Sequence, residues 1–299
     1  MTAAGRFAPS PSGDLHVGNL RTALLAWLFA RSSGRDFRIR MEDLDRVKAG
    51  ATQRQLADLA ALGLDWSLPV VAQSDRLATY RATVDRLAAA GETFECFCTR
   101  REVLDAPSAP HAPPGAYPGT CRDLTEAERV ERRRDRPAAI RLRAAVTGFT
   151  VHDQLHGGYT GDVDDFVLLR GDGTPAYNLA VVVDDAAFDI DQVVRGDDLL
   201  SSAPRQAYLA QRLGHAVPEY AHVPMVLNDK GIRLSKRDGA ITLAQLAELG
   251  YDAPRVVSMM ATSLGMAAPD EPVTARELLR RFDPEALPRT PWTFVAPAA

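Results

Sequence analysis

The sequence predicts an α/β fold built on a parallel sheet, and three observations near its N-terminus carry this prediction. Residues 5–7 form a short stretch that could begin a buried strand, and a turn rich in proline, serine and glycine follows it. Residues 20–31 place leucine, alanine and tryptophan at helical spacing, and Gly34 ends that pattern. Residues 37–41 then alternate apolar and polar side chains like a strand. A strand, a helix and a strand in this order favour two parallel neighbours joined by a crossover helix.

Further elements continue the same pattern along the chain. Helical spacing recurs at residues 51–62, 75–90 and 203–213. Strand-like runs return after a long interruption, at residues 165–170 and 193–195. The interruption is rich in proline between Cys96 and about Leu124, which excludes a long helix there and indicates an inserted module. We therefore divide the chain into a first catalytic half (1–93), an insert (94–150), a second catalytic half (151–214) and a C-terminal region (215–299).

Composition narrows the class of protein. The chain has 299 residues, of which 46% are hydrophobic and 25% charged, which is typical of a globular protein and argues against disorder. No apolar run approaches the roughly 20 residues that a membrane helix needs, and no secretory signal is evident, so we expect a cytoplasmic monomer without a membrane partner. The net charge of −4 restricts any RNA contact to a local basic surface.

The turn after the first strand has the character of a phosphate site. Residues 8–13 are rich in proline, serine and glycine, and they lead through His16 and Gly18 into the first helix. Small residues let a ligand approach the backbone, and a helix N-terminus offers N–H groups and a partial positive charge. His16 could add a hydrogen bond to a phosphate oxygen. The alternative is an ordinary turn with a surface histidine.

A second phosphate element is the basic loop at residues 229–239. It combines lysine and arginine with two glycines and carries Ser235 and Lys236 at its centre. Cationic side chains on such a loop can neutralise the charge that develops on pyrophosphate as it leaves ATP. The alternative is a solvated basic turn, and only the pairing of both elements makes the nucleotide interpretation specific.

The two elements together resemble the HIGH and KMSKS signatures of class I aminoacyl-tRNA synthetases. His16-Val-Gly-Asn19 is similar to HIGH, with Asn19 in place of the last histidine, and residues 233–237 are similar to KMSKS, with Arg233 in place of the first lysine. The segments RFAPSPSGDLHVGNLRTAL, RMEDLD, YNLAVVVDD and VVRGDDLLSSAPRQ resemble glutamyl-tRNA synthetases in particular. The resemblance implies a Rossmann-like parallel sheet with a zinc-containing insert and a small helical C-terminal region.

The resemblance also implies roles for individual residues. Catalysis falls to His16 and Lys236, and ATP, with its Mg²⁺, is bound by His16, Gly18, Asn19, Ser235 and Lys236. L-Glutamate is bound by Arg6, Ser10, Glu42, Tyr177 and Arg195. These types suit the substrate independently, because arginine pairs with a carboxylate through two hydrogen bonds and a carboxylate pairs with an ammonium group. The alternatives are a structural ion pair for Glu42 and Arg195 and core packing for Tyr177.

The three cysteines of the chain lie in the insert. Cys96, Cys98 and Cys121 are too few for a disulfide scaffold, and their clustering suggests a metal site in a reducing compartment. With Tyr117 they resemble the structural zinc site of this family, which implies one Zn²⁺ per chain. His111 is the rival fourth ligand, and three free thiols without a metal are the alternative to both.

The acceptor of the activated glutamate is indicated by two features. Only about sixty residues follow Gly239, which leaves no room for an anticodon-binding domain, and Val181 stands where full-length synthetases have asparagine. Both features resemble the truncated glutamyl-queuosine tRNA(Asp) synthetase branch. This resemblance implies glutamate activation without tRNA and transfer to queuosine in the anticodon of tRNA(Asp). The alternatives are a truncated synthetase that charges a tRNA 3′ end and a non-catalytic nucleotide- or RNA-binding relative.

Two further groups of residues are candidates for binding RNA or a metal ion. Seven arginines between Arg129 and Arg143 could contact RNA phosphates, but a solvated helix face is the alternative that we favour. His152 and His156 are four residues apart, and we expect a surface or core pair there and no second metal site.

Overall fold

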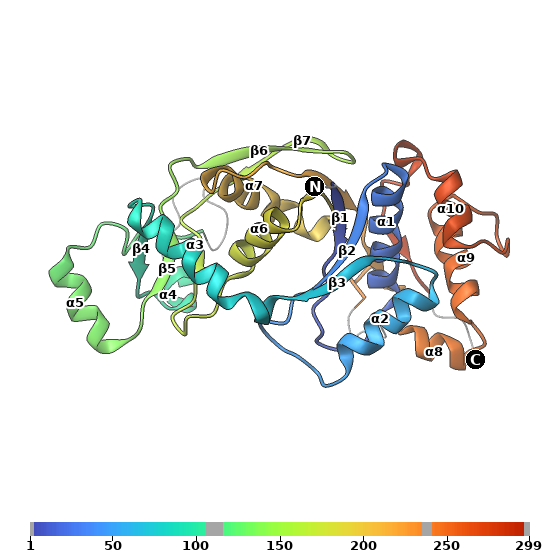
Figure 1. The fold of residues 1–299 in the computed structure, drawn as a ribbon, viewed down its shortest axis with the longest axis horizontal. Coiled ribbons are helices and arrows are strands. Elements are labelled where there is room, and N and C mark those ends of the chain that lie inside the picture. Colours follow the sequence, from blue (N-terminus) through green and yellow to red (C-terminus); the bar gives the residue numbers. More distant parts are fainter. Residues whose placement is uncertain (1–2, 106–115, 235–240, 296–299) are drawn as a thin grey trace.

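A seven-stranded sheet forms the centre of the molecule in the computed structural model, which describes residues 3–105, 116–234 and 241–295 (Figure 1). Its order is β3–β2–β1–β9–β10–β6–β7. All neighbouring pairs are parallel except β6 and β7, which form an antiparallel hairpin. The strands are β1 (Ala4–Phe7), β2 (Asp36–Met41), β3 (Ser67–Ala72), β6 (Gly148–Asp153), β7 (Gly157–Asp162), β9 (Ile190–Gly196) and β10 (Glu219–Val223). The predicted parallel α/β fold is confirmed.

The chain reverses its direction of travel across the sheet at β1. From β1 it crosses through α1 (Val17–Ser32) to β2 on one side, whereas β9 pairs with the other side of β1. Two parallel strands whose connections leave in opposite directions open a crevice at their carboxyl ends, where ligands of open α/β sheets bind. The carboxyl ends of β1 and β9 therefore place the candidate site.

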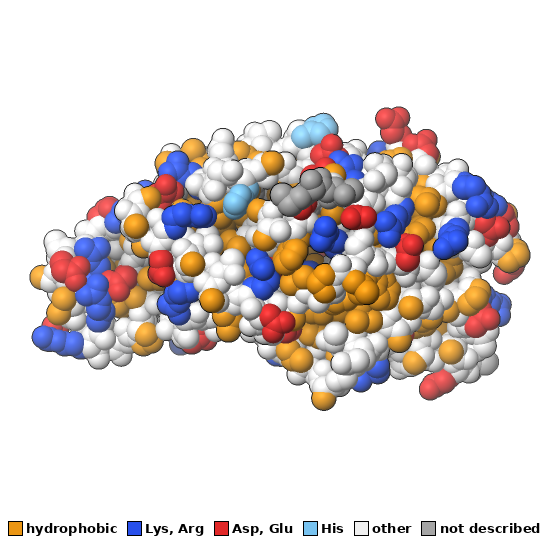
Figure 2. All heavy atoms as spheres, in the orientation of Figure 1, with side chains coloured by type: hydrophobic (Ala, Val, Ile, Leu, Met, Phe, Trp, Pro, Cys, Tyr) orange, Lys and Arg blue, Asp and Glu red, His pale blue; other side chains and the backbone are white. Residues whose placement is uncertain are grey.

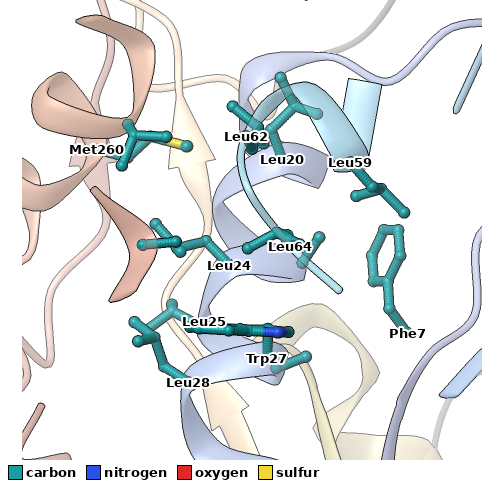
Figure 3. Close-up of a cluster of buried hydrophobic side chains, with 14 of the residues drawn as sticks. Phe7, Leu20, Leu24, Leu25, Trp27, Leu28, Leu59, Leu62, Leu64 and Met260 are labelled. Carbon is teal, nitrogen blue, oxygen red and sulfur yellow. The ribbon is translucent and has the colours of Figure 1, made fainter. Parts of the chain in front are cut away.

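The largest part of the core surrounds α1. Its leucines and Trp27 are buried against the sheet on one side and against α2 (Ala51–Ala61), α9 (Ala253–Ser263) and α10 (Ala275–Arg281) on the other (Figure 3). Each fully buried leucine contributes about 1.5–3 kcal/mol relative to an exposed one. Gly5 of β1 lets α1 approach closely, because a Cβ there would lie 2.8 Å from the Cβ of Ala30. This packing holds the C-terminal part of α1 against β1 and fixes the helix on the sheet.

The opposite face of the sheet is covered by α6 (Tyr177–Ala187) and α7 (Ala203–Arg212), which pack on each other (Figure 1). With α3 (Leu77–Ala89) they enclose a second apolar cluster that contains Tyr80, Leu168 and Leu179. The α6 helix begins at Tyr177, so it brings that side chain to the sheet edge where β9 ends.

The inserted segment extends one end of the molecule. A separate antiparallel sheet of β4 (Thr93–Cys96), β5 (Ala139–Leu142) and β8 (Val167–Leu169) lies there with α4 (Arg100–Asp105) and α5 (Glu126–Asp135) (Figure 1). The remaining elements are η1 (Gln73–Arg76), η2 (Asp197–Ser202), β11 (Val226–Leu227), α8 (Leu243–Glu248), η3 (Pro284–Ala286) and β12 (Trp292–Thr293).

Most predicted elements are confirmed with small shifts at their ends. The helix predicted from residue 20 begins at Val17, because His16 caps it. The segment predicted as a helix over 75–90 is divided into η1 and α3. The hydrophobic pattern of the sequence predicts neither α6 nor the β6–β7 hairpin. Among the described residues, no helix combines the length and apolar character required to cross a membrane.

Candidate active site

A cavity of about 370 Å³ opens at the carboxyl ends of β1 and β9. It is lined by every predicted glutamate- and nucleotide-binding residue that lies within the described ranges: Arg6, Ser10, His16, Gly18, Asn19, Glu42, Tyr177 and Arg195. These residues come from β1, the turn before α1, the end of β2, the start of α6 and the end of β9. The parallel sheet thus brings together side chains that are up to 189 positions apart in sequence, from Arg6 to Arg195.

Arg195 is a buried cation with neutral partners only. Its Nε donates to Nε2 of His222 at 2.9 Å, and its Nη1 donates to Oε1 of Gln206 at 2.7 Å and to the Tyr177 hydroxyl at 3.4 Å. Its Nη2 donates to the carbonyl oxygen of Leu199 at 3.3 Å. No carboxylate of the described residues forms an ion pair with Arg195, although its charge acts through space on the ionised Asp185. A desolvated charge of this kind is costly unless a ligand of opposite charge pairs with it.

A network of charged residues includes two side chains of the cavity lining, Arg6 and Glu42, and two buried ones that lie behind it, Arg40 and Asp185. Asp185 lies between two arginines, since Nη1 of Arg40 is 2.5 Å and Nε of Arg6 is 3.5 Å from its Oδ1. Nη2 of Arg40 also donates to Oε1 of Glu42 at 3.3 Å. Burial alone would raise the pKa of Asp185, but the charges of Arg40 and Arg6 hold that pKa below its usual value. Asp185 is therefore ionised and orients both arginines.

Glu42 is the acid of the cavity whose ionised form is disfavoured by burial. Burial raises its pKa above the usual value, even though Arg40 and Arg6 act in the opposite direction. The alternative role considered for Glu42 was a structural ion pair, and Glu42 does pair with Arg40. Glu42 also lines the cavity, so it remains available to a ligand. An ammonium group bound beside Glu42 would favour the charged carboxylate and offset this cost.

His16 caps the helix that begins at the cavity. Its Nδ1 accepts the N–H groups of Gly18 at 3.1 Å and Asn19 at 3.3 Å, and the Asn19 side chain accepts from the His16 backbone at 3.4 Å. The N–H of Val17 donates to the carbonyl oxygen of Ile241. The expectation of free N–H groups at this helix N-terminus is therefore corrected: in this conformation they are already hydrogen-bonded. Because Nδ1 is an acceptor, the neutral ring carries its proton on Nε2, which faces away from the cap.

Gly18 is required by the same geometry. A Cβ at this position would lie 3.0 Å from the His16 ring and 3.4 Å from Cβ of Val226. The close approach of the ring to the helix backbone thus depends on glycine here.

The loop with the KMSKS-like sequence begins at the edge of the cavity. Nη1 of Arg233 pairs with Oδ2 of Asp198 at 2.6 Å, and both residues line the cavity. Arg233 thereby connects the loop to η2, which follows β9. Ser235 and Lys236, predicted to bind ATP, lie outside the described residues.

A larger cavity, of about 920 Å³, lies in the C-terminal region between α9 and β12. Its lining includes Tyr251, Met259, Val273 and Trp292 and none of the predicted site residues. Size alone would favour it as the binding site. The larger cavity also carries an arginine and two acids, but all three are exposed: Asp252, Arg255 and Asp270. The smaller cavity combines two buried arginines with an acid beside a capped helix N-terminus, and buried charges of this kind mark functional sites.

The three cysteines converge in the insert. Their Sγ atoms all lie within 4.8 Å of one another, and those of Cys98 and Cys121 are 3.6 Å apart. The Tyr117 hydroxyl is 3.4 Å from Sγ of Cys96 and 3.9 Å from Sγ of Cys98. A tetrahedral zinc ion with four ligands requires spacings of about 3.8 Å between sulfur atoms, so the donor set fits. The rival ligand, His111, lies outside the described residues.

The surroundings of two of these thiols shift their pKa values in opposite directions. Burial, with the neighbouring thiols, raises the pKa of Cys98 to about 12. Despite burial, the N–H of Phe97 and the side chains of Tyr117 and Cys98 lower the pKa of Cys121. A metal ion bound at this site would favour the thiolate form of its cysteine ligands.

The arginines of α5 and the following strand are mostly paired with acids. Arg133 contacts both Glu95 and Glu126, and Arg134 contacts Glu131. Figure 2 shows basic and acidic side chains interleaved at the end of the molecule where Figure 1 places α5. This arrangement favours a solvated, ion-paired helix face over a dedicated phosphate-binding surface.

Several residues around the cavity were not singled out from sequence. Arg40 and Asp185 lie in the quoted segments RMEDLD and YNLAVVVDD, but only the packing of α6 against the sheet brings them together. Gln206 likewise ends the quoted segment VVRGDDLLSSAPRQ, whereas His222 and Asp153 carried no signal in sequence. His152 is exposed, and Nε2 of His156 contacts the carbonyl oxygen of His222.

Residues 3–297 match the protein family described as tRNA synthetases class I (E and Q), catalytic domain. The sequence is 66% identical over 290 residues to the glutamyl-Q tRNA(Asp) synthetase of Nocardia farcinica, covering 97% of this chain and 92% of that protein. It is 41% identical to the glutamate–tRNA ligase of Geobacter sulfurreducens, covering 97% of this chain and 63% of that protein. The structure resembles a glutamate tRNA ligase from Elizabethkingia meningosepticum in complex with its amino acid, with a TM-score of 0.82, 26% identity and coverage of 99% and 68%.

Proposed function

The chain belongs to the class I glutamyl- and glutaminyl-tRNA synthetase family, and on that premise we propose that it activates L-glutamate with ATP and transfers it to queuosine in the anticodon of tRNA(Asp). The glutamate carboxylate attacks the α-phosphorus of ATP, the bond to the β-phosphate breaks, and pyrophosphate leaves. A hydroxyl of queuosine then attacks the carbonyl carbon of glutamyl-adenylate, and AMP leaves.

The observation that carries the proposal is the buried guanidinium of Arg195 in the cavity beside His16. Its charge faces neutral partners among the described residues, so a carboxylate ligand would complete the site. Arg195 binds one carboxylate of glutamate, Arg6 contributes a second cation, and Glu42 binds the α-ammonium group. The hydroxyls of Tyr177 and Ser10 complete the hydrogen bonds.

The nucleotide occupies the part of the cavity at the start of α1. His16 donates through Nε2 to a phosphate oxygen, and Gly18 allows the nucleotide to approach the backbone. The Asn19 side chain adds a polar contact. None of these groups is a nucleophile, so the residues act by holding the two substrates in line and stabilising charge.

Lys236 would neutralise charge on the leaving pyrophosphate, and the Ser235 hydroxyl would donate a hydrogen bond to it. A Mg²⁺ ion bound to the ATP phosphates would supply further positive charge. Arg233 supports this loop through its ion pair with Asp198.

The insert holds one structural zinc ion through Cys96, Cys98, Cys121 and Tyr117. When bound, the metal would cross-link the segment with Cys96 and Cys98 to the segment with Tyr117 and Cys121. Four protein ligands would leave no open coordination position for catalysis. The guanidinium of Arg141 lies 3.8 Å from the centre of the Tyr117 ring and keeps its hydroxyl directed at the cysteines.

The choice of acceptor is supported by the named relatives. The chain spans most of the Nocardia farcinica protein but only 63% of the Geobacter sulfurreducens ligase. The test is transfer of labelled glutamate to tRNA(Asp) prepared with and without queuosine. Transfer only to the queuosine-bearing tRNA supports the proposal, and equal transfer to both would replace it with charging of the 3′ end.

A further inference from the structure

A row of three buried polar side chains crosses three adjacent strands behind the cavity. His222 on β10 is the register partner of Arg195 on β9, and Asp153 ends the neighbouring strand β6. Oδ2 of Asp153 lies 2.5 Å from Nδ1 of His222, whose Nε2 accepts the Nε–H of Arg195 at 2.9 Å. His222 and Asp153 are fully buried. The cavity lining includes Arg195 but neither of these two residues.

The hydrogen bonds assign the protons in this row. Nε of an arginine only donates, so Nε2 of His222 must be the unprotonated nitrogen and Nδ1 must carry the hydrogen. Burial, and then the charge of Arg195, lower the pKa of His222 despite the adjacent Asp153. Burial alone would raise the pKa of Asp153, but the bonds from His222 and from the N–H groups of Leu155 and His156 lower it. The row is therefore an ionised carboxylate, a neutral imidazole and a guanidinium.

A neutral spacer between the acid and the arginine has a physical consequence. A carboxylate placed directly on Arg195 would fix its plane but would also neutralise the charge that a substrate carboxylate requires. The imidazole fixes the plane through one hydrogen bond and leaves the charge available. Asp153 in turn holds the imidazole in the tautomer that can accept from Arg195, as carboxylates do for other functional histidines.

The remaining bonds of Arg195 complete the orientation. Gln206 and Tyr177 accept from Nη1 and the Leu199 carbonyl accepts from Nη2, so four of the five guanidinium N–H groups are used among the described residues. The planar group is thus held at several points, with an Nη2 N–H left for a ligand.

We propose that Asp153 and His222 are positioning residues that hold the guanidinium of Arg195 for recognition of the carboxylate of the amino-acid substrate. This inference rests on the proposed function, because it assumes that the ligand of Arg195 is glutamate. It assigns a role to two residues that touch neither substrate.

Two variants of His222 separate positioning from folding. In His222→Gln the side-chain oxygen reaches the place of Nε2 and can still accept from Arg195, whereas in His222→Asn the amide reaches only the place of Nδ1 and keeps the bond to Asp153. Glutamate-dependent exchange of pyrophosphate into ATP is measured for both, with KM for glutamate and for ATP, the kcat/KM ratio of glutamate to glutamine, and Tm. His152→Asn, an exposed histidine on the same strand as Asp153, is the control.

We expect His222→Asn to raise KM for glutamate by about tenfold to a hundredfold, the range expected when a binding group is misplaced by about 1 Å. Its KM for ATP stays near the wild-type value, and its preference for glutamate over glutamine falls. His222→Gln restores most of the glutamate KM, although both variants lose Tm. His152→Asn behaves as the wild type.

Two results would overturn the inference in distinguishable ways. If the wild type exchanges with glutamate but His222→Asn and His222→Gln both keep its KM for glutamate, Asp153 and His222 serve folding only. If both variants raise KM for glutamate and ATP together, the effect is general and positioning is again excluded. If the wild type itself shows no glutamate-dependent exchange, the proposed function fails and this inference fails with it.

Discussion

Replacement of Arg195 tests the charge logic of the cavity through two variants of graded severity. Arg195→Lys keeps a positive charge but loses the planar fork, and Arg195→Met keeps much of the length without the charge. A hydrogen bond to a charged group contributes about 1.5–3 kcal/mol, and a buried charge left without its partner costs about 2–5 kcal/mol. At about 1.4 kcal/mol per factor of ten, kcat/KM for glutamate should fall by roughly 10- to 150-fold in the lysine variant.

The methionine variant should lose more, by about 30- to several-thousand-fold, because the substrate carboxylate would then face no charge from this position. The assay is glutamate-dependent exchange of pyrophosphate into ATP at saturating ATP. Arg212→Met, an exposed arginine that pairs with Glu92, is the matched control and should leave kcat/KM unchanged. If Arg195→Met retains kcat/KM within about threefold of the wild type, Arg195 binds no substrate carboxylate, and the interpretation of its neutral surroundings is refuted.

Burial raises the pKa of Glu42, and binding of the α-ammonium group needs the ionised carboxylate, so KM for glutamate should rise as the pH falls through that raised pKa. Glu42→Gln should have a high KM for glutamate at every pH, and a pH-independent KM in the wild type would contradict the role of Glu42. Gly18→Ala should raise KM for ATP at least severalfold by displacing the His16 ring, whereas unchanged ATP kinetics would show that the cap tolerates a Cβ. Cys121→Ser should reduce bound zinc, measured by atomic absorption, well below one ion per chain, and full retention would exclude Cys121 as a ligand. Leu24→Ala should lower the free energy of unfolding in urea by about 2–5 kcal/mol without altering KM, and a loss below 1 kcal/mol would contradict its place in the core.

The N-terminal part of the fold was predictable because its signals are local. Helical spacing and glycine stops located α1 and α2, and the strand–helix–strand order gave the parallel sheet. The start of α1 was placed three residues late, since histidine is an uncommon cap and its ring accepts two backbone N–H groups only in the folded geometry. A short apolar run such as YNLAVVVDD suits either a strand or a buried helix, so α6 had no distinct signal.

A site residue was predictable where the short sequence motif around it is itself recognisable. Arg6, His16, Glu42 and Arg195 stood out through the motifs around them, and the structure places them around one cavity. The supporting residues could not be inferred in the same way. His222 lies 69 positions from Asp153 and 27 from Arg195, and only the pairing of β6, β10 and β9 brings the three together.

The central claim is that one cavity binds a dicarboxylic amino acid beside ATP. Exchange of labelled pyrophosphate into ATP, measured with each of the standard amino acids and without RNA, tests it most directly. We predict exchange with L-glutamate well above that with glutamine or aspartate. Exchange that is absent with glutamate, or equal for glutamate and glutamine, would contradict the claim.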